Sequence, residues 1–115
     1  MAITCDLSVL SSQKYKLLTI RSKAANSYLL LESIIYITSC EGYSCFYLVD
    51  GSRYQSCQTL KEYEVLLSNE GFVRISKSCI INRLHLKHYD ILARKVQMHN
   101  NIKLTVSVRR VKSLR

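Results

Sequence analysis

The apolar residues of this chain occur in short runs, and this pattern limits the folds that it can adopt. No run approaches the roughly eighteen apolar residues of a membrane-spanning helix; the longest, such as Tyr28–Leu31 and Ile34–Ile37, have the length of strands. The pattern predicts strands over residues 16–22, 27–31, 34–39, 44–49, 53–57, 73–75, 86–92, 95–98 and 103–108. A mainly β domain follows.

Turn signals separate these runs. Asp50-Gly51 predicts a two-residue hairpin turn, because glycine tolerates the positive φ that such turns require. His99–Asn101 is expected to form a second tight turn, and a third is expected within residues 79–84.

One stretch has helical spacing instead. Thr59 and Glu62 fit a capping box, in which the two side chains satisfy backbone amides at the start of a helix. Leu60, Tyr63, Leu66 and Leu67 follow on one helical face, and Gly71 lies where a left-handed cap can end the helix. We therefore expect one short amphipathic helix.

Length and composition indicate a single folded domain. The chain has 115 residues, of which 48% are apolar and 22% charged, a globular composition. We expect residues 1–15 to form a flexible leader and residues 16–115 to form the domain. No secretory signal is visible, and five cysteines without a C-x-x-C motif predict reduced thiols and a cytoplasmic location. Cys40 and Cys45 are interpreted as packing residues.

Positive charge is concentrated in the last third of the chain. Residues 1–70 hold six Lys/Arg and seven Asp/Glu, whereas residues 71–115 hold eleven Lys/Arg and only one acid, Asp90. Such one-sided charge attracts polyanions, either nucleic acid or an anionic membrane. Membrane binding is disfavoured, because it requires a basic amphipathic helix and the basic residues here lie in strand-like sequence.

The sequence does not predict an enzyme. Its three histidines, His85, His88 and His99, share the basic half with one acid and form no arrangement of nucleophile, base and orienting group. Cys79 with His85 and His88 has loose spacing and lacks a fourth ligand, so no metal site is predicted. We expect no cofactor and no small-molecule substrate.

Three segments in order carry a resemblance to a known family. They are "SIIYITSCEGYSCFYLVDGSRYQSCQTLKEYEVLL", "GFVRISKSCIINRLHLK" and "IKLTVSVRRVKSL". Their strand, T-L-x-E helix, F-x-R segment and terminal S-x-R-R pattern resemble the LytTR DNA-binding domain of many bacterial response regulators, over residues 16–114. The resemblance implies an elongated domain of several antiparallel sheets with one or two short helices. It also implies that loops, rather than a recognition helix, enter the major grooves of DNA.

The resemblance also implies three contact regions. Glu41–Cys45 matches the first DNA-reading loop, Ser76–Ser78 matches an H-R-S element, and Val108–Arg110 matches the terminal S-R-R element. The candidates for base reading are Ser44, Lys77 and Arg109. The candidates for phosphate contact are Arg74, Ser76, Ser78, Arg110 and Lys112.

Side-chain chemistry supports some of these assignments. Arg109 can donate two parallel hydrogen bonds to guanine, a geometry that lysine and serine lack. Lys77, Arg74 and Lys112 suit phosphates, for which a long cationic side chain suffices. The alternatives are a solvated strand face for Arg74 and a helix-dipole partner for Lys112. Asn82 is expected to cap a local turn.

The sequence departs from the family pattern at three positions, so base preference cannot be copied from relatives. Ser76 replaces histidine, Val108 replaces arginine, and Thr105 stands where proline is common. The predicted function is sequence-specific binding of double-stranded DNA by a bacterial transcription regulator, with two copies on a repeated element. A single-stranded RNA or DNA module and a protein-interaction or oligomerisation domain are the alternatives. Nothing in the sequence resembles a receiver domain, so we expect a free-standing domain or a fragment.

Overall fold

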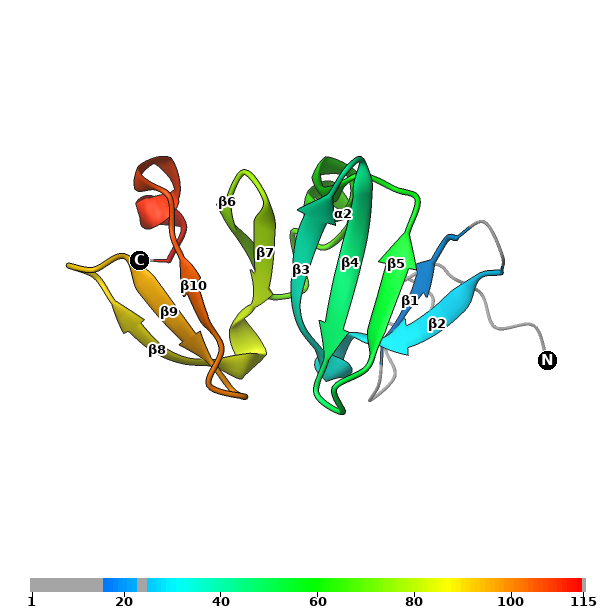
Figure 1. The fold of residues 1–115 in the computed structure, drawn as a ribbon, viewed down its shortest axis with the longest axis horizontal. Helices are drawn as coiled ribbons and strands as arrows, with labels where there is room; N and C mark the ends of the chain where they lie inside the picture. Colours follow the sequence, from blue (N-terminus) through cyan, green and yellow to red (C-terminus); the bar gives the residue numbers. More distant parts are fainter. Residues whose placement is uncertain (1–15, 23–24, 115) are drawn as a thin grey trace.

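The structure, a computed structural model, describes residues 16–22 and 25–114, so the expected leader at 1–15 lies outside the described residues. Its strands form three antiparallel sheets (Figure 1). Their strands are β1 (Leu17–Ile20), β2 (Ser27–Leu30), β3 (Ile34–Cys40), β4 (Tyr43–Leu48), β5 (Arg53–Ser56), β6 (Phe72–Ser76), β7 (Cys79–Asn82), β8 (Leu86–Asp90), β9 (Lys95–Met98) and β10 (Lys103–Thr105). The helical segments are η1 (Leu31–Ser33), α2 (Leu60–Leu66), η2 (Arg83–His85) and η3 (Val108–Leu114).

A five-stranded sheet in the order β5-β4-β3-β7-β6 forms the middle of the molecule. The β1-β2 hairpin lies at one end of the long axis and the β8-β9-β10 sheet at the other (Figure 1). The molecule measures 49 × 32 × 25 Å. The predicted elongated, mainly β architecture is therefore confirmed.

The central sheet is covered on both faces at strand β7. Ile80 of β7 belongs to a cluster with residues of β1, β2 and α2, whereas its neighbours Cys79 and Ile81 belong to a second cluster with Val96 and Met98 of β9. Successive residues of a strand point to opposite faces, so each cluster occupies one side of the sheet. Phe72, Ile75, Cys79, Ile80 and Ile81 are all buried, as predicted.

Burial on both faces explains one wrong prediction. The stretch Cys79–Asn82 is not part of a turn but strand β7, and all four of its residues are buried. A strand covered on both faces shows a continuous apolar run without alternation. The turn lies earlier, at Lys77 and Ser78, because Ser76 pairs with Cys79.

Two hairpin turns contain three residues rather than two. Leu48 N–H donates to Ser52 O (3.1 Å), and only Gly51 of the predicted Asp50-Gly51 pair has a positive φ, at 87°. The β9–β10 turn repeats this arrangement at Asn101, with φ 67°. The expected turn at 99–101 is therefore confirmed, whereas the two-residue geometry at 50–51 is wrong.

The capping box of α2 forms as predicted. Glu62 N–H donates to the Thr59 hydroxyl, and Thr59 N–H donates to the Glu62 carboxylate. The helix ends at Leu66, too early for Gly71 to cap it. Gly71, with φ 83°, instead precedes β6, and its carbonyl accepts from Arg83 N–H (2.9 Å).

The chain leaves the β8-β9-β10 sheet sooner than expected. Strand β10 ends at Thr105; Val106 N–H still donates to Arg94 O, but Ser107 N–H donates to Ile75 O of β6 (both 2.8 Å). This change of partner directs the chain along β6 as η3, so residues 106–108 do not continue the strand.

Candidate nucleic-acid interface

Two tight turns and η3 lie along one long edge of the molecule. The β3–β4 turn, the β6–β7 turn, α2 and η3 all face the upper side of Figure 1, although they come from distant parts of the sequence. Ser39 N–H donates to Ser78 O (2.9 Å) and so joins the two turns. Ser107 N–H, bonded to Ile75 O, joins the start of η3 to β6. We call this the turn edge.

The β3–β4 turn is tighter than the expected DNA-reading loop. Only Glu41 and Gly42 lie between the paired residues Cys40 and Tyr43, and both have positive φ values, 49° and 86°. This is the two-residue hairpin geometry that matches the twist of its strands. Most of the predicted Glu41–Cys45 loop is therefore strand β4.

The position of Ser44 follows from that geometry and corrects its expected role. Ser44 pairs with Ser39 on one side and Ser56 on the other, inside the sheet. Its side chain is fully buried, and its hydroxyl donates to Gln58 O (2.8 Å). A buried hydroxyl with its hydrogen bond already made cannot read a base. We therefore exclude Ser44 from the contact set.

The side chain of Arg74 stabilises the β6–β7 turn through hydrogen bonds to its backbone. Its Nε donates to Ser76 O (3.1 Å) and its Nη2 to Lys77 O (2.6 Å). Its Nη1 donates to a Glu64 carboxylate oxygen of α2 (2.9 Å), and only 13% of the side chain is exposed. Neither a phosphate contact nor the alternative of a solvated strand face fits this position.

The same glutamate holds a second arginine. Arg110 Nη1 of η3 donates to the other carboxylate oxygen of Glu64 at 3.1 Å. Burial alone would raise the pKa of Glu64, but the hydrogen bonds from Arg74 and Arg110 outweigh burial and lower that pKa. Glu64 is therefore ionised at neutral pH, and we call the three side chains the Glu64 clamp.

The remaining predicted contact residues lie on or near the surface of the turn edge. Lys77 and Ser78 are exposed in the β6–β7 turn, and Arg109 and Lys112 are exposed in η3. Ser76 is half-buried, and its hydroxyl accepts from Ser78 N–H (3.2 Å). Within residues 16–22 and 25–114, the side chains of Lys77, Arg109 and Lys112 make no hydrogen bond or ion pair. These three cations are therefore available to a partner.

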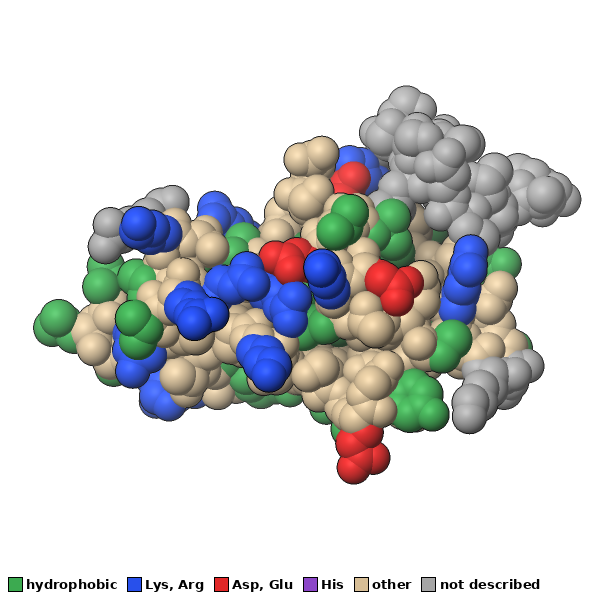
Figure 2. Space-filling view, turned by 90° about the horizontal axis from the view of Figure 1, so that it is seen from above, with side chains coloured by type: hydrophobic (Ala, Val, Ile, Leu, Met, Phe, Trp, Pro, Cys, Tyr) green, Lys and Arg blue, Asp and Glu red, His purple; other side chains and the backbone are tan. Residues whose placement is uncertain are grey.

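Figure 2, which views the turn edge from above, shows Lys and Arg side chains gathered over its middle and over the end that holds η3. A shallow hollow separates the β6–β7 turn from the end of β10, and six of its eight lining residues carry a hydroxyl group: Thr38, Ser39, Ser76, Ser78, Thr105 and Ser107. A basic, hydroxyl-rich edge suits the phosphate oxygens of nucleic acid.

Glu64 and Lys61 were not predicted from the sequence to belong to this surface. Lys61 is exposed near the start of α2 and lines a second hollow, between that helix and the two turns. Glu64 reads as an ordinary polar residue of an amphipathic helix. Its partners are 10 and 46 positions away, so helical spacing gives no sign of the clamp.

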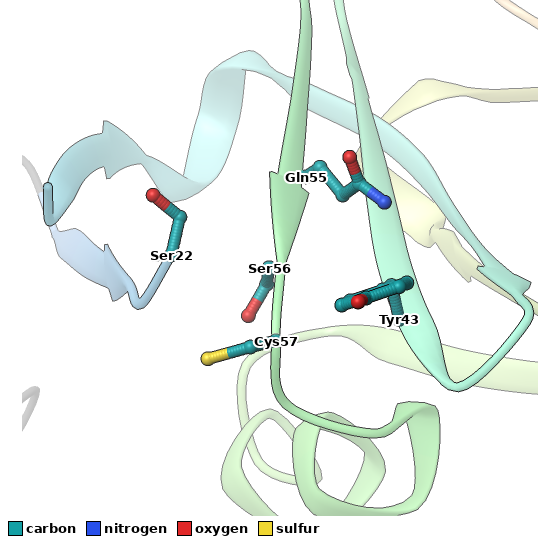
Figure 3. Close-up of a pocket in the computed structure, with 5 residues that line it drawn as sticks. All are labelled: Ser22, Tyr43, Gln55, Ser56 and Cys57. Atoms are coloured by element: carbon teal, nitrogen blue, oxygen red, sulfur yellow. The ribbon is translucent and has the colours of Figure 1, made fainter. Parts of the chain in front are cut away.

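Another hollow lies beside β5, between the segment after β1 and the first residue of β4 (Figure 3). Ser22, Tyr43, Gln55, Ser56 and Cys57 line it. The buried Ser56 hydroxyl is hydrogen-bonded to Tyr63 Oη (2.5 Å), which in turn donates to Gln58 Oε1. None of the lining residues is a histidine or carboxylate, so this hollow has no general base for its serines.

Metal ligands do not gather in the described part of the chain: no three His, Cys, Asp or Glu side chains come together as a metal site requires. Burial raises the pKa of Cys79 to about 12, so this thiol is protonated and unsuited to ligation. Among the described helices, none is long and apolar enough to cross a membrane.

Asn82 occupies the structural position that we expected. Its side-chain amide donates to Leu31 O and Ile34 O, and its carbonyl accepts from Leu84 N–H at the start of η2. It is 3% exposed, so it caps a turn inside the domain.

The fold and the turn edge together define a β domain that presents short turns and a basic helical segment on one side. Residues 25–115 match the family model described as the LytTr DNA-binding domain, and the chain belongs to this family. A similar solved structure is described as the LytTr DNA-binding domain of a methyl-accepting/DNA response regulator from Bacillus cereus. Its TM-score is 0.73 at 20% identity, with 86% of this chain and 93% of that chain covered, which supports the fold. No curated protein matches the chain.

Proposed function

We propose that this domain binds double-stranded DNA in a sequence-specific manner and positions a bacterial transcription regulator at its target site. The observation that carries the proposal is the turn edge, where Lys77, Arg109 and Lys112 are exposed and unpaired within the described residues while the nearby Glu64 is held by two arginines. Free cations beside a neutralised acid favour a polyanionic partner.

The two turns suit insertion into a major groove better than contact with a flat surface. Each is a hairpin end with two residues between its paired strands, and Ser39 N–H ties them together. The major groove, about 12 Å wide, admits a two-stranded ribbon, and its base edges distinguish all four base pairs. We propose that the turns and η3 approach the grooves and that no recognition helix is needed.

The proposed contacts divide by chemistry. Arg109 is the base-reading candidate, because its guanidinium is exposed and can donate two parallel bonds to guanine. Lys77 and Lys112 suit phosphates, and Ser78 can donate a hydrogen bond to a phosphate oxygen beside them. Ser76, already bonded to Ser78 N–H, shapes the turn and contributes less.

The experiment that tests this proposal is selection of bound sequences from a randomised duplex pool by the full chain. We expect enrichment of one motif, repeated with fixed spacing if two copies bind together. The enriched duplex should then resist competition by either of its single strands and by RNA of the same sequence.

Two results would count against the proposal. A pool that stays random after several rounds would remove sequence specificity. Stronger competition by single strands or RNA than by duplex would favour a single-stranded nucleic-acid module instead.

A further inference from the structure

We infer that Glu64 is a positioning residue for DNA binding, which fixes the geometry of the turn edge without touching DNA. This inference rests on the proposed function. One carboxylate accepts hydrogen bonds from Arg74 of β6 (2.9 Å) and from Arg110 of η3 (3.1 Å), through different oxygens. The consecutive elements α2 and β6 and the distant segment η3 therefore meet at one side chain of α2.

The first arm of the clamp leads to the β6–β7 turn. Arg74, held by Glu64, also donates to the carbonyls of Ser76 and Lys77. The Arg74 guanidinium, which Glu64 holds in place, thus fixes the backbone that carries Lys77. A planar guanidinium with several directed donors suits this task, whereas a lysine would supply a single point charge.

The second arm leads to η3. Arg110 directly follows Arg109, and both lie in the same 3-10 segment. Glu64 holds the Arg110 side chain against α2, and this contact helps to set the direction in which the neighbouring, exposed Arg109 points. The start of the segment is fixed by the hydrogen bond from Ser107 N–H to Ile75 O. Farther along, Val111 and Leu114 pack against the second core cluster, and Arg83 donates to Ser113 O.

The clamp also withholds two cations from DNA. Arg74 and Arg110 are paired to one carboxylate, and the Arg74 side chain is mostly buried. Free arginines at these positions would take phosphates of any sequence, which raises random binding as much as specific binding. We therefore expect the clamp to increase discrimination between sequences.

The test compares Glu64→Gln with Glu32→Gln in the full chain, on the selected duplex and on a scrambled duplex of the same composition. Glutamine keeps the shape of Glu64 but has one acceptor oxygen and no charge. Glu32 is the matched control: it is an exposed acid of η1, outside the two turns and η3, and its side chain makes no hydrogen bond or ion pair with the described residues.

The two substitutions should change the affinity for the selected duplex in opposite directions. Both lose a negative charge, so both should bind the scrambled duplex as well as wild type or better. Glu32→Gln should also bind the selected duplex at least as well as wild type. Glu64→Gln should lose selected binding, and its ratio of selected to scrambled affinity should fall roughly tenfold, within the usual range for coupled polar groups.

Salt dependence supplies a second readout through Arg110→Gln. In the wild-type background this change should leave the slope of log affinity against log salt unaltered, because Arg110 is held by Glu64. In the Glu64→Gln background, Arg110→Gln should make the slope less steep by about 0.9, because one phosphate contact is lost. If Glu64→Gln does not fold, as judged by circular dichroism, the single Arg110→Gln variant still tests whether Arg110 contacts phosphate directly.

Distinct outcomes overturn the inference and the proposed function. A wild-type chain that does not distinguish the selected from the scrambled duplex removes the proposed function, and the inference with it. If wild type discriminates but Glu64→Gln keeps its ratio, like Glu32→Gln, only the inference is wrong. A lower salt slope for Arg110→Gln in the wild-type background would likewise show that Arg110 contacts phosphate directly.

Discussion

Two adjacent arginines of η3 have different environments, and this difference yields a prediction at the scale of single residues. Arg109 is exposed and forms no hydrogen bond with the described residues, whereas Arg110 is paired to Glu64. Arg109→Ala should cost about 1 to 3 kcal/mol on the selected duplex and relax the preference at one base pair. Lys77→Ala should weaken selected and scrambled duplexes alike, as loss of a phosphate contact does.

Titrations of both variants against single-base-pair changes in the selected duplex measure these effects. Arg109→Gln keeps a hydrogen-bonding side chain without the charge and serves as the control for lost electrostatic attraction. Equal losses on selected and scrambled DNA for Arg109→Ala would remove Arg109 from base reading.

The role of a side chain could be predicted from the sequence only where the residues next to it in the chain determine that role. Burial of Ile75, Ile80 and Ile81 follows from their apolar character, and the structure confirms it. Ser44 could not be placed, because its burial depends on the two strands that flank β4. The contacts of Glu64 likewise depend on tertiary structure.

At the scale of elements, α2 depends on its cap, because a helix of seven residues has few hydrogen bonds of its own. Thr59→Ala removes the acceptor for Glu62 N–H and should lower the free energy of unfolding by about 1 kcal/mol. Urea unfolding measures this change. Thr59→Ser, which keeps the hydroxyl, should remain close to wild type, and an equal loss in both variants would mean that the cap is not the cause.

Some strands could be predicted from local sequence signals, whereas others depend on the topology of the sheets. Most strands and the helix start were predictable, because alternation and a capping box are local signals. Strand β7 was not, because both of its faces are covered by elements that the local sequence cannot specify. The end of β10 was also missed, since it depends on Ser107 N–H bonding to β6 rather than to β9.

For the whole molecule, the elongated shape separates two long edges. The turn edge carries Lys77, Arg109 and Lys112, while the β9–β10 turn lies at the opposite edge (Figure 1). Lys87 of β8 donates to Asn101 Oδ1 in that opposite turn. The molecule therefore offers exposed lysines at both edges, and only one edge should meet DNA.

Salt dependence tests this arrangement. If Lys61, Lys77 and Lys112 together neutralise three phosphates, log affinity should fall against log salt with a slope of roughly −3. Lys112→Gln should reduce the slope by about 0.9, whereas Lys87→Gln, an exposed lysine at the opposite edge, should leave it unchanged. Fluorescence anisotropy of a labelled duplex across a range of salt concentrations gives all three slopes. Equal reductions by the two substitutions would mean that DNA meets the domain through its general positive charge rather than through the turn edge, because only oriented binding distinguishes the two lysines.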